Sequence, residues 1–376
     1  MSAVYVHIPV CKSKCCYCDF FSVTTGFDES LFVKSVIKEI DFRKNFLNQP
    51  VESVYFGGGT PSLMKPESLN SILKSIDNNF IFSENPELTL EVNPDDLDEH
   101  FLRKVKSIGI NRLSIGVQSL NDDILKFLNR RHSVEQAKKA IYYAKKVGFD
   151  NISVDLICGI PGLTIKTWKQ TLDEIVSYRP QHISVYILTA ESGTPLNEKL
   201  KKGIVALPDE EIVTEQFLFT SLFLKKSGYL HYEISNFALK GKESHHNSAY
   251  WKGKHYLGLG PSAHSYNGLT RQWNVHSLKT YIAEIQKGNI PVTVENLSLT
   301  DRFNDYIITT MRTSNGADIN YINDKFGEVY KEHILEKIKP YISKDYILVN
   351  KNILTLTTAG MLVSDFIFRE LIFDND

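Results

Sequence analysis

Short apolar runs alternate with longer segments of helical period from residue 4 to residue 226. The run at residues 4–8 precedes a segment in which Phe32, Val36 and Ile40 form one apolar stripe, as in an amphipathic helix. Five more pairs of strand and helix follow, with strands expected at residues 53–56, 88–92, 113–117, 152–157 and 183–188. This order predicts an α/β fold with a parallel sheet and external helices, in the form of a partial (β/α)6 TIM-like barrel that is open on one side.

The alternation stops near residue 267, and from there the chain predicts mainly helices. Helices are expected at residues 278–285, 303–311 and 329–335, followed by a hairpin of residues 346–349 and 353–356 and a last helix from about residue 359. This order is typical of a small winged-helix-like α+β domain. We therefore expect three parts: the barrel at residues 1–228, a connecting segment at 229–266 and a C-terminal domain at 267–376.

The composition is that of an ordinary soluble protein with little net charge. Of the 376 residues, 42% are hydrophobic and 23% are charged, and the formal net charge is −1. No surplus of positive charge favours nucleic acid or a membrane surface. The N-terminus lacks the basic start and the uninterrupted apolar stretch of a signal peptide, and no segment approaches the length that spans a bilayer. We expect a cytoplasmic protein with no nucleic-acid partner and no stable membrane insertion.

Polar and glycine-rich segments follow the predicted strands, where an α/β barrel places its ligand-binding residues. They are residues 11–18, 57–61 and 91–94, then Gln118, Asp155 and residues 189–194. Any one of these segments is explained well as a turn or a strand cap. Because all six would lie on one rim of the barrel, together they indicate a ligand site there.

The cysteines indicate a metal site. Four of the five lie within eight residues, at positions 11, 15, 16 and 18, which is unlike the spread cysteines of a disulfide framework; Cys158 is far away. Cys11, Cys15 and Cys18, at Cx3Cx2C spacing, can ligate three irons of a [4Fe–4S] cluster and leave the fourth iron open. The alternatives are a zinc site, for which no fourth ligand stands nearby, and a CxxC redox pair, which leaves Cys11 unexplained.

The segment Tyr5-Val6-His7-Ile8-Pro9, followed by the three cysteines, resembles the signature of the radical S-adenosylmethionine (radical SAM) proteins. The resemblance implies a radical SAM barrel in which S-adenosylmethionine binds the open iron. It also implies reductive cleavage of S-adenosylmethionine to a 5′-deoxyadenosyl radical, for which the protein supplies position and exclusion of water. With these three ligands Cys16 is a spare thiol, at a position where relatives commonly have proline.

The same resemblance assigns cofactor-binding residues along the rim. The glycine segment would let backbone groups approach the methionine part of the cofactor. Positions that resemble contacts to the cluster-bound S-adenosylmethionine are Tyr5, Tyr17, Gly58, Gly59, Thr60 and Glu91. Positions that resemble contacts to a second S-adenosylmethionine in the porphyrinogen oxidase branch are Gln118, Arg130 and Asp155. For Gln118 and Asp155 the alternative is a hydrogen bond at the end of a strand.

Nearly the whole chain resembles two close groups, the oxygen-independent coproporphyrinogen III oxidases and the HemW heme chaperones. The oxidase pattern carries an extra cysteine two residues after the third ligand, and it has a longer N-terminal extension. In this chain Phe20 occupies that place, and only ten residues precede Cys11. Both departures favour the chaperone group. The alternative is the oxidase, which decarboxylates a porphyrinogen in porphyrin biosynthesis.

The sequence of residues 246–251, His-Asn-Ser-Ala-Tyr-Trp, resembles the HNxxYW element of the HemW group. It implies that His246 is the axial ligand of a heme iron, while aromatic rings cover the macrocycle. His245 is the rival ligand, and a packed histidine–aromatic corner of the core is the alternative to any heme role. The resemblance implies a chaperone that delivers heme to an acceptor protein, in a family that often forms homodimers. It leaves open whether S-adenosylmethionine is cleaved in turnover.

Overall fold

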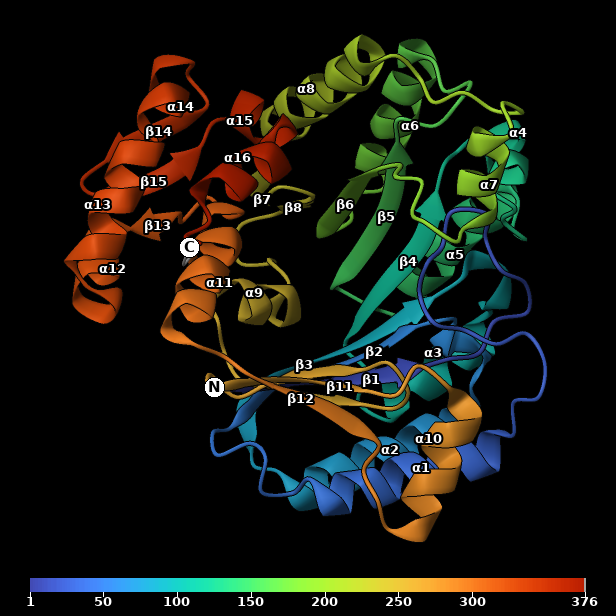
Figure 1. Cartoon of the computed structure of the whole chain (residues 1–376). Helices are drawn as coiled ribbons and strands as arrows, with labels where there is room; N and C mark the ends of the chain where they lie inside the picture. The colour runs from blue at the N-terminus through green and yellow to red at the C-terminus, as the bar shows by residue number, and fades with distance from the viewer. Residues whose placement is uncertain (375–376) are drawn as a thin grey trace.

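One twelve-stranded sheet dominates the structure, a computed structural model that describes residues 1–374 (Figure 1). At its centre six adjacent parallel strands follow one another in chain order: β1 (Ser2–Ile8), β2 (Val51–Gly58), β3 (Phe82–Val92), β4 (Arg112–Gln118), β5 (Ile152–Cys158) and β6 (His182–Ile187). Helices outside the curved sheet connect them, chiefly α1 (Glu29–Phe42), α2 (Pro66–Asn79), α3 (Glu99–Ser107), α5 (Val134–Lys146) and α6 (Ile165–Ser177), and α8 (Glu210–Lys226) follows the last of them. Within the described residues the sheet does not close, so the predicted open (β/α)6 barrel is confirmed.

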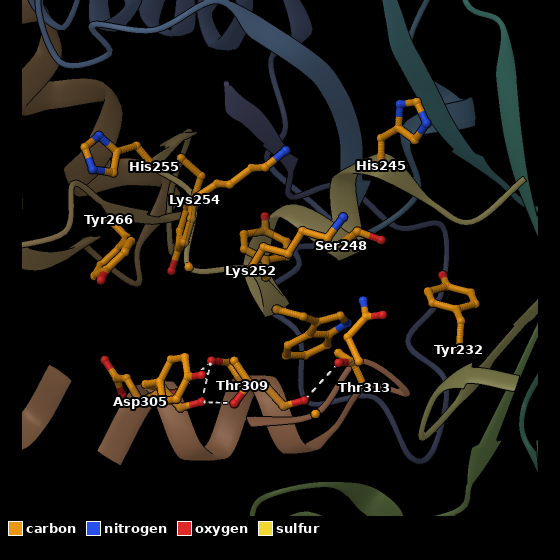
Figure 2. Close-up of a pocket in the computed structure, with 18 of the residues that line it drawn as sticks. Tyr232, His245, Ser248, Lys252, Lys254, His255, Tyr266, Asp305, Thr309 and Thr313 are labelled. Carbon is orange, nitrogen blue, oxygen red and sulfur yellow. Dashed lines mark hydrogen bonds between the residues drawn. The ribbon is translucent and has the colours of Figure 1, made fainter. Parts of the chain in front are cut away.

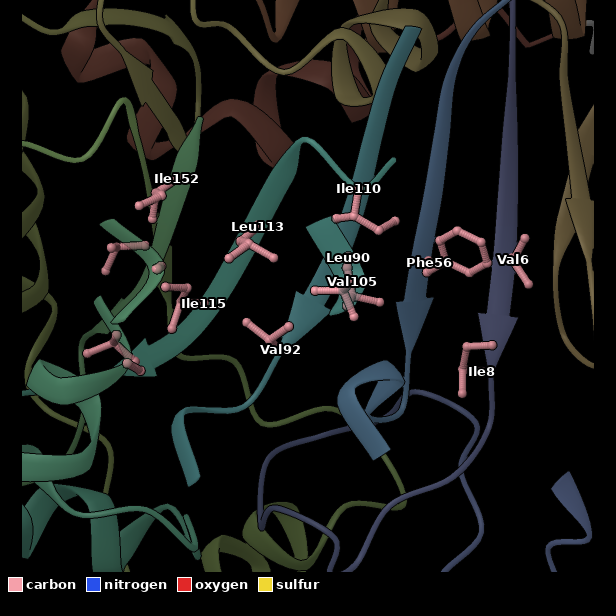
Figure 3. Packing of buried hydrophobic residues seen from close by; sticks show 14 of the residues in the cluster. Val6, Ile8, Phe56, Leu90, Val92, Val105, Ile110, Leu113, Ile115 and Ile152 are labelled. Atoms are coloured by element: carbon pink, nitrogen blue, oxygen red, sulfur yellow. The ribbon is translucent and has the colours of Figure 1, made fainter. Parts of the chain in front are cut away.

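Alternate residues of the parallel strands face outward and form the main core with the helices. On β1 these residues are Val4, Val6 and Ile8, and all three are fully buried. Figure 3 shows Val6 and Ile8 beside Phe56 of β2, with Leu90 of β3 farther along the same layer. Burial of a side chain of this size contributes roughly 1.5–3 kcal/mol relative to exposure. The outward positions therefore hold the sheet and its helices together.

The positions in between face the interior of the barrel, and most of them are polar. Strands buried on both faces of a parallel sheet are usually apolar throughout. Here the inward side chains hydrogen bond across neighbouring strands: Tyr55 Oη donates to Glu91 Oε1 at 2.8 Å, and Ser114 Oγ donates to Asp155 Oδ2 at 2.9 Å. Other inward polar residues are Ser53, Glu87, Arg112, Ser153 and His182. The interior of the barrel is therefore a hydrogen-bonded polar layer rather than an apolar core.

Short strands extend the sheet at both edges. β9 (Tyr256–Leu259) pairs with β1 in parallel and is followed by the antiparallel strands β10 (His264–Tyr266), β11 (Thr270–Asn274) and β12 (Val292–Asn296). At the other edge lie β8 (Asn236–Ala238) and β7 (Leu230–Glu233). The periodicity predicted the helix α10 (Leu278–Lys287) but not these strands. The predicted boundary after residue 266 falls between β10 and β11, which pair with each other, and the sheet continues to residue 296.

The chain after residue 298 forms most of a second apolar core, to which α8 contributes Phe217. It contains α11 (Leu299–Met311), β13 (Ala317–Asp318), α12 (Ile319–Phe326), α13 (Glu328–Lys337), α14 (Lys339–Ser343), β14 (Ile347–Asn350), β15 (Ile353–Leu356), α15 (Thr358–Leu362) and α16 (Ser364–Leu371). The predicted hairpin is confirmed as β14 and β15, and its turn residues Lys351 and Asn352 both have positive φ, as a tight hairpin requires. The predicted small α+β domain is thus present. Among residues 1–374 no helix is both long and apolar enough to cross a membrane.

A buried ionic cluster joins α1 to the added strands. Glu39 of α1 is fully buried and accepts hydrogen bonds from Asn274 Nδ2 at 2.7 Å, Tyr281 Oη at 2.6 Å and the Gly260 N–H at 2.9 Å. Its carboxylate lies 3.4 Å from Nε of the buried Arg43. Because α1 belongs to the first β/α unit, this cluster fixes residues 260–281 to the barrel.

We expect Glu39→Ala to lower the free energy of unfolding by about 3–5 kcal/mol, since it leaves the buried Arg43 without its counter-ion. Chemical denaturation followed by circular dichroism measures the change. Glu67→Ala is the matched control, because Glu67 forms an exposed ion pair with Lys104 and its loss should change stability little. Equal unfolding midpoints for the two variants would contradict the role given to Glu39.

Candidate cluster and cofactor site

The carboxyl ends of the parallel strands enclose a cavity of about 440 Å³. Most of the residues that the sequence predicted for the cluster and for S-adenosylmethionine line this one cavity. They are Cys11, Cys15, Tyr17, Cys18, Gly58, Gly59, Thr60, Glu91, Gln118, Arg130 and Asp155. Tyr5 and His246 are the two predicted residues that do not line it.

The structure separates the three predicted ligands from the other two cysteines. Cys16 is buried on the far side of the loop, where its thiol donates to the carbonyl oxygen of Phe127 at 3.3 Å. Cys158 is fully buried in β5. All five thiols are free, and only those of Cys11, Cys15 and Cys18 face the cavity. The loop geometry therefore agrees with the ligand set expected from the Cx3Cx2C spacing.

Three thiols of one loop line the cavity, and two of them accept hydrogen bonds from neighbouring side chains. Across residues 1–374 no three Cys, His, Asp or Glu side chains converge on one point as mononuclear zinc requires. In a [4Fe–4S] cluster each thiolate binds a different iron, so the sulfur atoms stand farther apart. Thr60 Oγ1 donates to Cys11 Sγ and Arg130 Nη1 donates to Cys15 Sγ, both at 3.4 Å, and such donors stabilise cluster-ligating sulfur. These residues fit the cluster.

The glycine loop packs directly on the cysteine loop. The Gly59 N–H donates to the Ile8 carbonyl at 2.8 Å, and a Cβ at Gly59 would lie 2.6 Å from the Val10 carbonyl oxygen and 3.1 Å from Cys11 Sγ. Gly58 has φ +108°, and a Cβ there would meet the His7 ring at 2.6 Å. Gly59 is thus required by the close approach of the two loops, and Gly58 by its positive φ and by the His7 ring of β1. These reasons hold in addition to any contact with a cofactor.

Two acidic side chains face the cavity from the barrel interior. Glu91 accepts hydrogen bonds from the Gly58 N–H at 3.1 Å and from Tyr55 Oη at 2.8 Å. Burial raises the pKa of Glu91 to about 7. Burial also raises the pKa of Asp155, against the opposing effect of hydrogen bonds from Ser184 and Ser114. A cationic ligand would be stabilised by the ionised form of either carboxyl.

Arg130 is held beside the cysteine loop. Its Nη2 donates to Asn93 Oδ1 at 2.6 Å and to the Gly116 carbonyl at 2.9 Å. The neighbouring Gln118 has a positive φ of 64°, which turns the chain at the end of β4. Because Arg130 also contacts Cys15, it places a fixed positive charge next to a predicted cluster ligand. This position is compatible with binding an anionic group of a ligand as well.

The structure adds cavity residues that the sequence analysis missed. Ser114 of β4 and Tyr186 of β6 line the cavity. Each lies two residues along its strand from another side chain that faces the barrel interior, so it faces the same way. Tyr55 lies one layer deeper and stacks against the predicted Tyr5, with ring centroids 6.1 Å apart. The sequence could have identified these residues. Polar and apolar residues alternate in these strands, whereas strands that a parallel sheet buries on both faces are usually apolar throughout.

His246 lies in a different layer of the barrel. It belongs to α9 (His245–Trp251), is 2% exposed, and stacks on Tyr55 with a centroid distance of 4.8 Å. Its Nδ1 is hydrogen bonded to Ser53 Oγ at 3.0 Å and its Nε2 to Tyr250 Oη at 2.9 Å. Burial lowers the pKa of His246 to about 3. Both ring nitrogens thus have hydrogen-bond partners in this arrangement, so the structure gives no support to the predicted role of His246 as heme ligand, and it does not test that role.

Comparison with known proteins agrees with this geometry. Residues 5–175 match the family model of the Radical SAM superfamily. The coproporphyrinogen III oxidase HemN of Escherichia coli, described as a radical SAM enzyme, has the same fold: the TM-score is 0.85 over 99% of this chain and 90% of that chain, at 23% sequence identity. The barrel and its three-cysteine loop thus define the class as the radical SAM proteins.

Full-length relatives define the family within that class. The heme chaperone HemW of Bacillus subtilis (strain 168) is 32% identical over 98% of this chain and 98% of its own. The heme chaperone HemW of Lactococcus lactis is 29% identical over 100% of this chain and 98% of its own. The chain belongs to the HemW family.

The ligand set can be tested with the five single cysteine-to-alanine variants. After anaerobic reconstitution we expect Cys11→Ala, Cys15→Ala and Cys18→Ala to lose the [4Fe–4S] cluster, since each removes a thiol that lines the cavity. Cys16→Ala and Cys158→Ala should retain it, because both thiols are buried away from the cavity. Iron and sulfide analysis measures the outcome. A complete cluster in Cys11→Ala would refute the ligand set.

The pKa of Glu91 predicts a pH dependence of S-adenosylmethionine binding. The cofactor is cationic at its ammonium and sulfonium groups, and Glu91 attracts it only when ionised. Below the raised pKa the carboxyl becomes neutral, so the affinity should fall about tenfold between pH 8 and pH 6, following the ionised fraction. Equilibrium binding to the reconstituted protein measures this. Glu91→Gln should bind weakly with a flat pH profile, whereas a wild-type profile in Glu91→Gln would assign the titration to another group.

Proposed function

We propose that this protein is a heme chaperone that binds heme, a [4Fe–4S] cluster and S-adenosylmethionine, and that it transfers the heme to an acceptor protein. The observation that carries the proposal is its similarity to proteins named heme chaperone HemW over 98% of the chain. The cavity with three thiols, a glycine loop and two buried carboxyls supports the two cofactors. The relatives thus support heme as the cargo, and the cavity residues support the cluster and S-adenosylmethionine as cofactors.

The cavity residues have distinct roles in this proposal. Cys11, Cys15 and Cys18 hold the cluster, which together with S-adenosylmethionine supplies reductive radical chemistry when both are bound. Glu91 holds the cationic part of S-adenosylmethionine, and the glycine loop excludes side chains from the space beside the cluster. Arg130 keeps a positive charge at the Cys15 sulfur.

Phe20 supports the chaperone over the oxidase. This residue lines the cavity and is 60% exposed, at the place where the oxidase pattern has an extra cysteine. A phenyl ring can neither ligate iron nor exchange a proton. The cavity therefore lacks, at this position, the thiol of the oxidase pattern.

The compartment and the assembly are part of the proposal. Clustered, unpaired thiols suit reducing surroundings, so we place the protein and its heme acceptor in the cytoplasm. A homodimer is the oligomeric form that we expect.

The test is a comparison of two porphyrins on the anaerobically reconstituted protein. Hemin should bind with one saturable Soret transition, and coproporphyrinogen III should not be converted to protoporphyrinogen IX with reductant and excess S-adenosylmethionine. Absorption titration and chromatographic product analysis measure the two results. Sustained conversion would make the porphyrin a substrate and the protein an oxidase, and failure to bind hemin would refute the chaperone function itself.

A further inference from the structure

A second, larger cavity lies at the opposite end of the barrel from the cluster site. It is a cleft of about 1,760 Å³, and its wall includes Glu52 at the start of β2 and Tyr256 at the start of β9. Both strands begin at this end, whereas the cluster cavity lies where the parallel strands finish. Ordinary small-molecule pockets have volumes of roughly 300–1,000 Å³. The cleft is therefore large enough for a macrocycle.

The cleft lies between α9 and α11. Figure 2 shows Lys252 near the middle of the cleft, Asp305 and Thr309 on α11 across from it, and His245 and His255 toward opposite ends of the view. The wall combines residues from the barrel, from the extra strands and from the C-terminal α+β part of the chain. A ligand in this cleft would contact all three.

Aromatic side chains form much of this wall. Nine of the lining residues are Tyr, Trp or Phe. Tyr250 and Tyr256 pack edge to face with centroids 4.6 Å apart, and Trp251 lies against the Arg312 guanidinium at 4.9 Å. The buried Nε1 of Trp251 has no hydrogen-bond partner among the described residues. Flat aromatic walls suit a flat, largely apolar ligand.

The cleft carries a local excess of positive charge in a chain whose formal net charge is −1. Six Lys or Arg side chains line it, against three carboxylates. Lys254 and Arg271 already pair with acidic residues. The other four cations form no ion pair with a carboxylate of residues 1–374; they are Lys225, Lys252, Arg302 and Lys325. Lys225 donates to Thr358 Oγ1 at 3.4 Å and Arg302 Nε to the Ser298 carbonyl at 3.3 Å, both of them uncharged acceptors. Such cations attract an anionic ligand.

The two neighbouring histidines of α9 face different compartments. Successive residues of a helix are about 100° apart around its axis, so both rings cannot face the same side. The His246 ring points into the barrel, where Ser53 and Tyr250 occupy both of its nitrogens. The His245 ring is exposed, lines the cleft, and forms no hydrogen bond with any described residue. A neutral imidazole with a free ring nitrogen can ligate heme iron.

We propose that heme binds in the cleft between α9 and α11, with His245 as its axial iron ligand, the aromatic wall against its macrocycle, and Lys252 and Arg302 beside its propionates. The proposal rests on the heme binding proposed above and specifies where it occurs. The cluster cavity is a quarter of the size and has its own predicted occupants. Cargo and cofactors therefore occupy opposite ends of one barrel.

His245→Ala tests the iron ligand in the full-length reconstituted protein. We expect hemin to bind about tenfold more weakly or worse, with a shifted Soret band, because removal even of groups that orient a metal ligand costs 10–100-fold. The iron–sulfur EPR signal should be unchanged, since the cluster lies in the other cavity. Added imidazole should restore the Soret band of His245→Ala, which a merely structural role would not allow.

His255→Ala and His246→Gln are the matched controls. His255 lines the same cleft but packs edge-on against Tyr266, so its loss should leave the Soret band in place. His246→Gln keeps a polar side chain at the buried position, and it should retain hemin binding wherever circular dichroism shows a folded protein. Loss of the Soret band in either control, with normal binding in His245→Ala, would overturn the proposal. Absence of hemin binding by the wild type would instead refute the proposed function.

The propionate contacts have an independent test. Lys252→Ala and Arg302→Ala should each weaken hemin binding by up to about tenfold, as expected for loss of one charge-assisted hydrogen bond. Neither should affect hemin dimethyl ester, in which the carboxylates are blocked. Lys254→Ala is the control, because Lys254 pairs with Glu52. Equal losses for hemin and its ester would show that these residues do not bind the propionates.

Discussion

The buried carboxylate of Glu87 determines how the two ends of this barrel are arranged. It lies 3.8 Å from Arg112 Nε, and it accepts the backbone N–H groups of His245 and His246, each at 3.1 Å. A charge inside a protein is stable only when it is paired and hydrogen bonded, and the N-terminus of a helix is a favourable place for a negative one. Glu87 therefore holds α9 at the end of the barrel where the parallel strands begin. The sheet does not close, so without α9 this end of the barrel would be accessible.

The position of α9 makes two compartments out of one barrel. On one side, the His246 ring stacks on Tyr55, which donates to Glu91 at the cluster cavity. On the other side, His245 and Trp251 line the cleft. Helix α9 thus packs against Tyr55, which lies next to the proposed cofactor cavity. It also forms one wall of the cleft in which we propose that heme binds.

The radical SAM fold itself does not determine the function of this chain. Its fold is shared with an oxidase at a TM-score of 0.85, although only 23% of the aligned residues are identical. What departs from the oxidase pattern is local: Phe20 stands at the rim of the cluster cavity. Chemistry and cargo are properties of such sites, which a common scaffold holds in place.

The sequence by itself determined the order of the β/α units, because the apolar periodicity of a strand or helix is local to it. It also predicted the cluster ligands, because three thiols within one loop lie close together whatever surrounds them. The short strands β7 to β12 escaped prediction, because they are stable only through pairing with distant segments. The same limit applies to the histidines of α9. They are adjacent in sequence, and only the docking of this helix on Glu87, 158 residues before His245, directs one ring into the barrel and the other into the cleft.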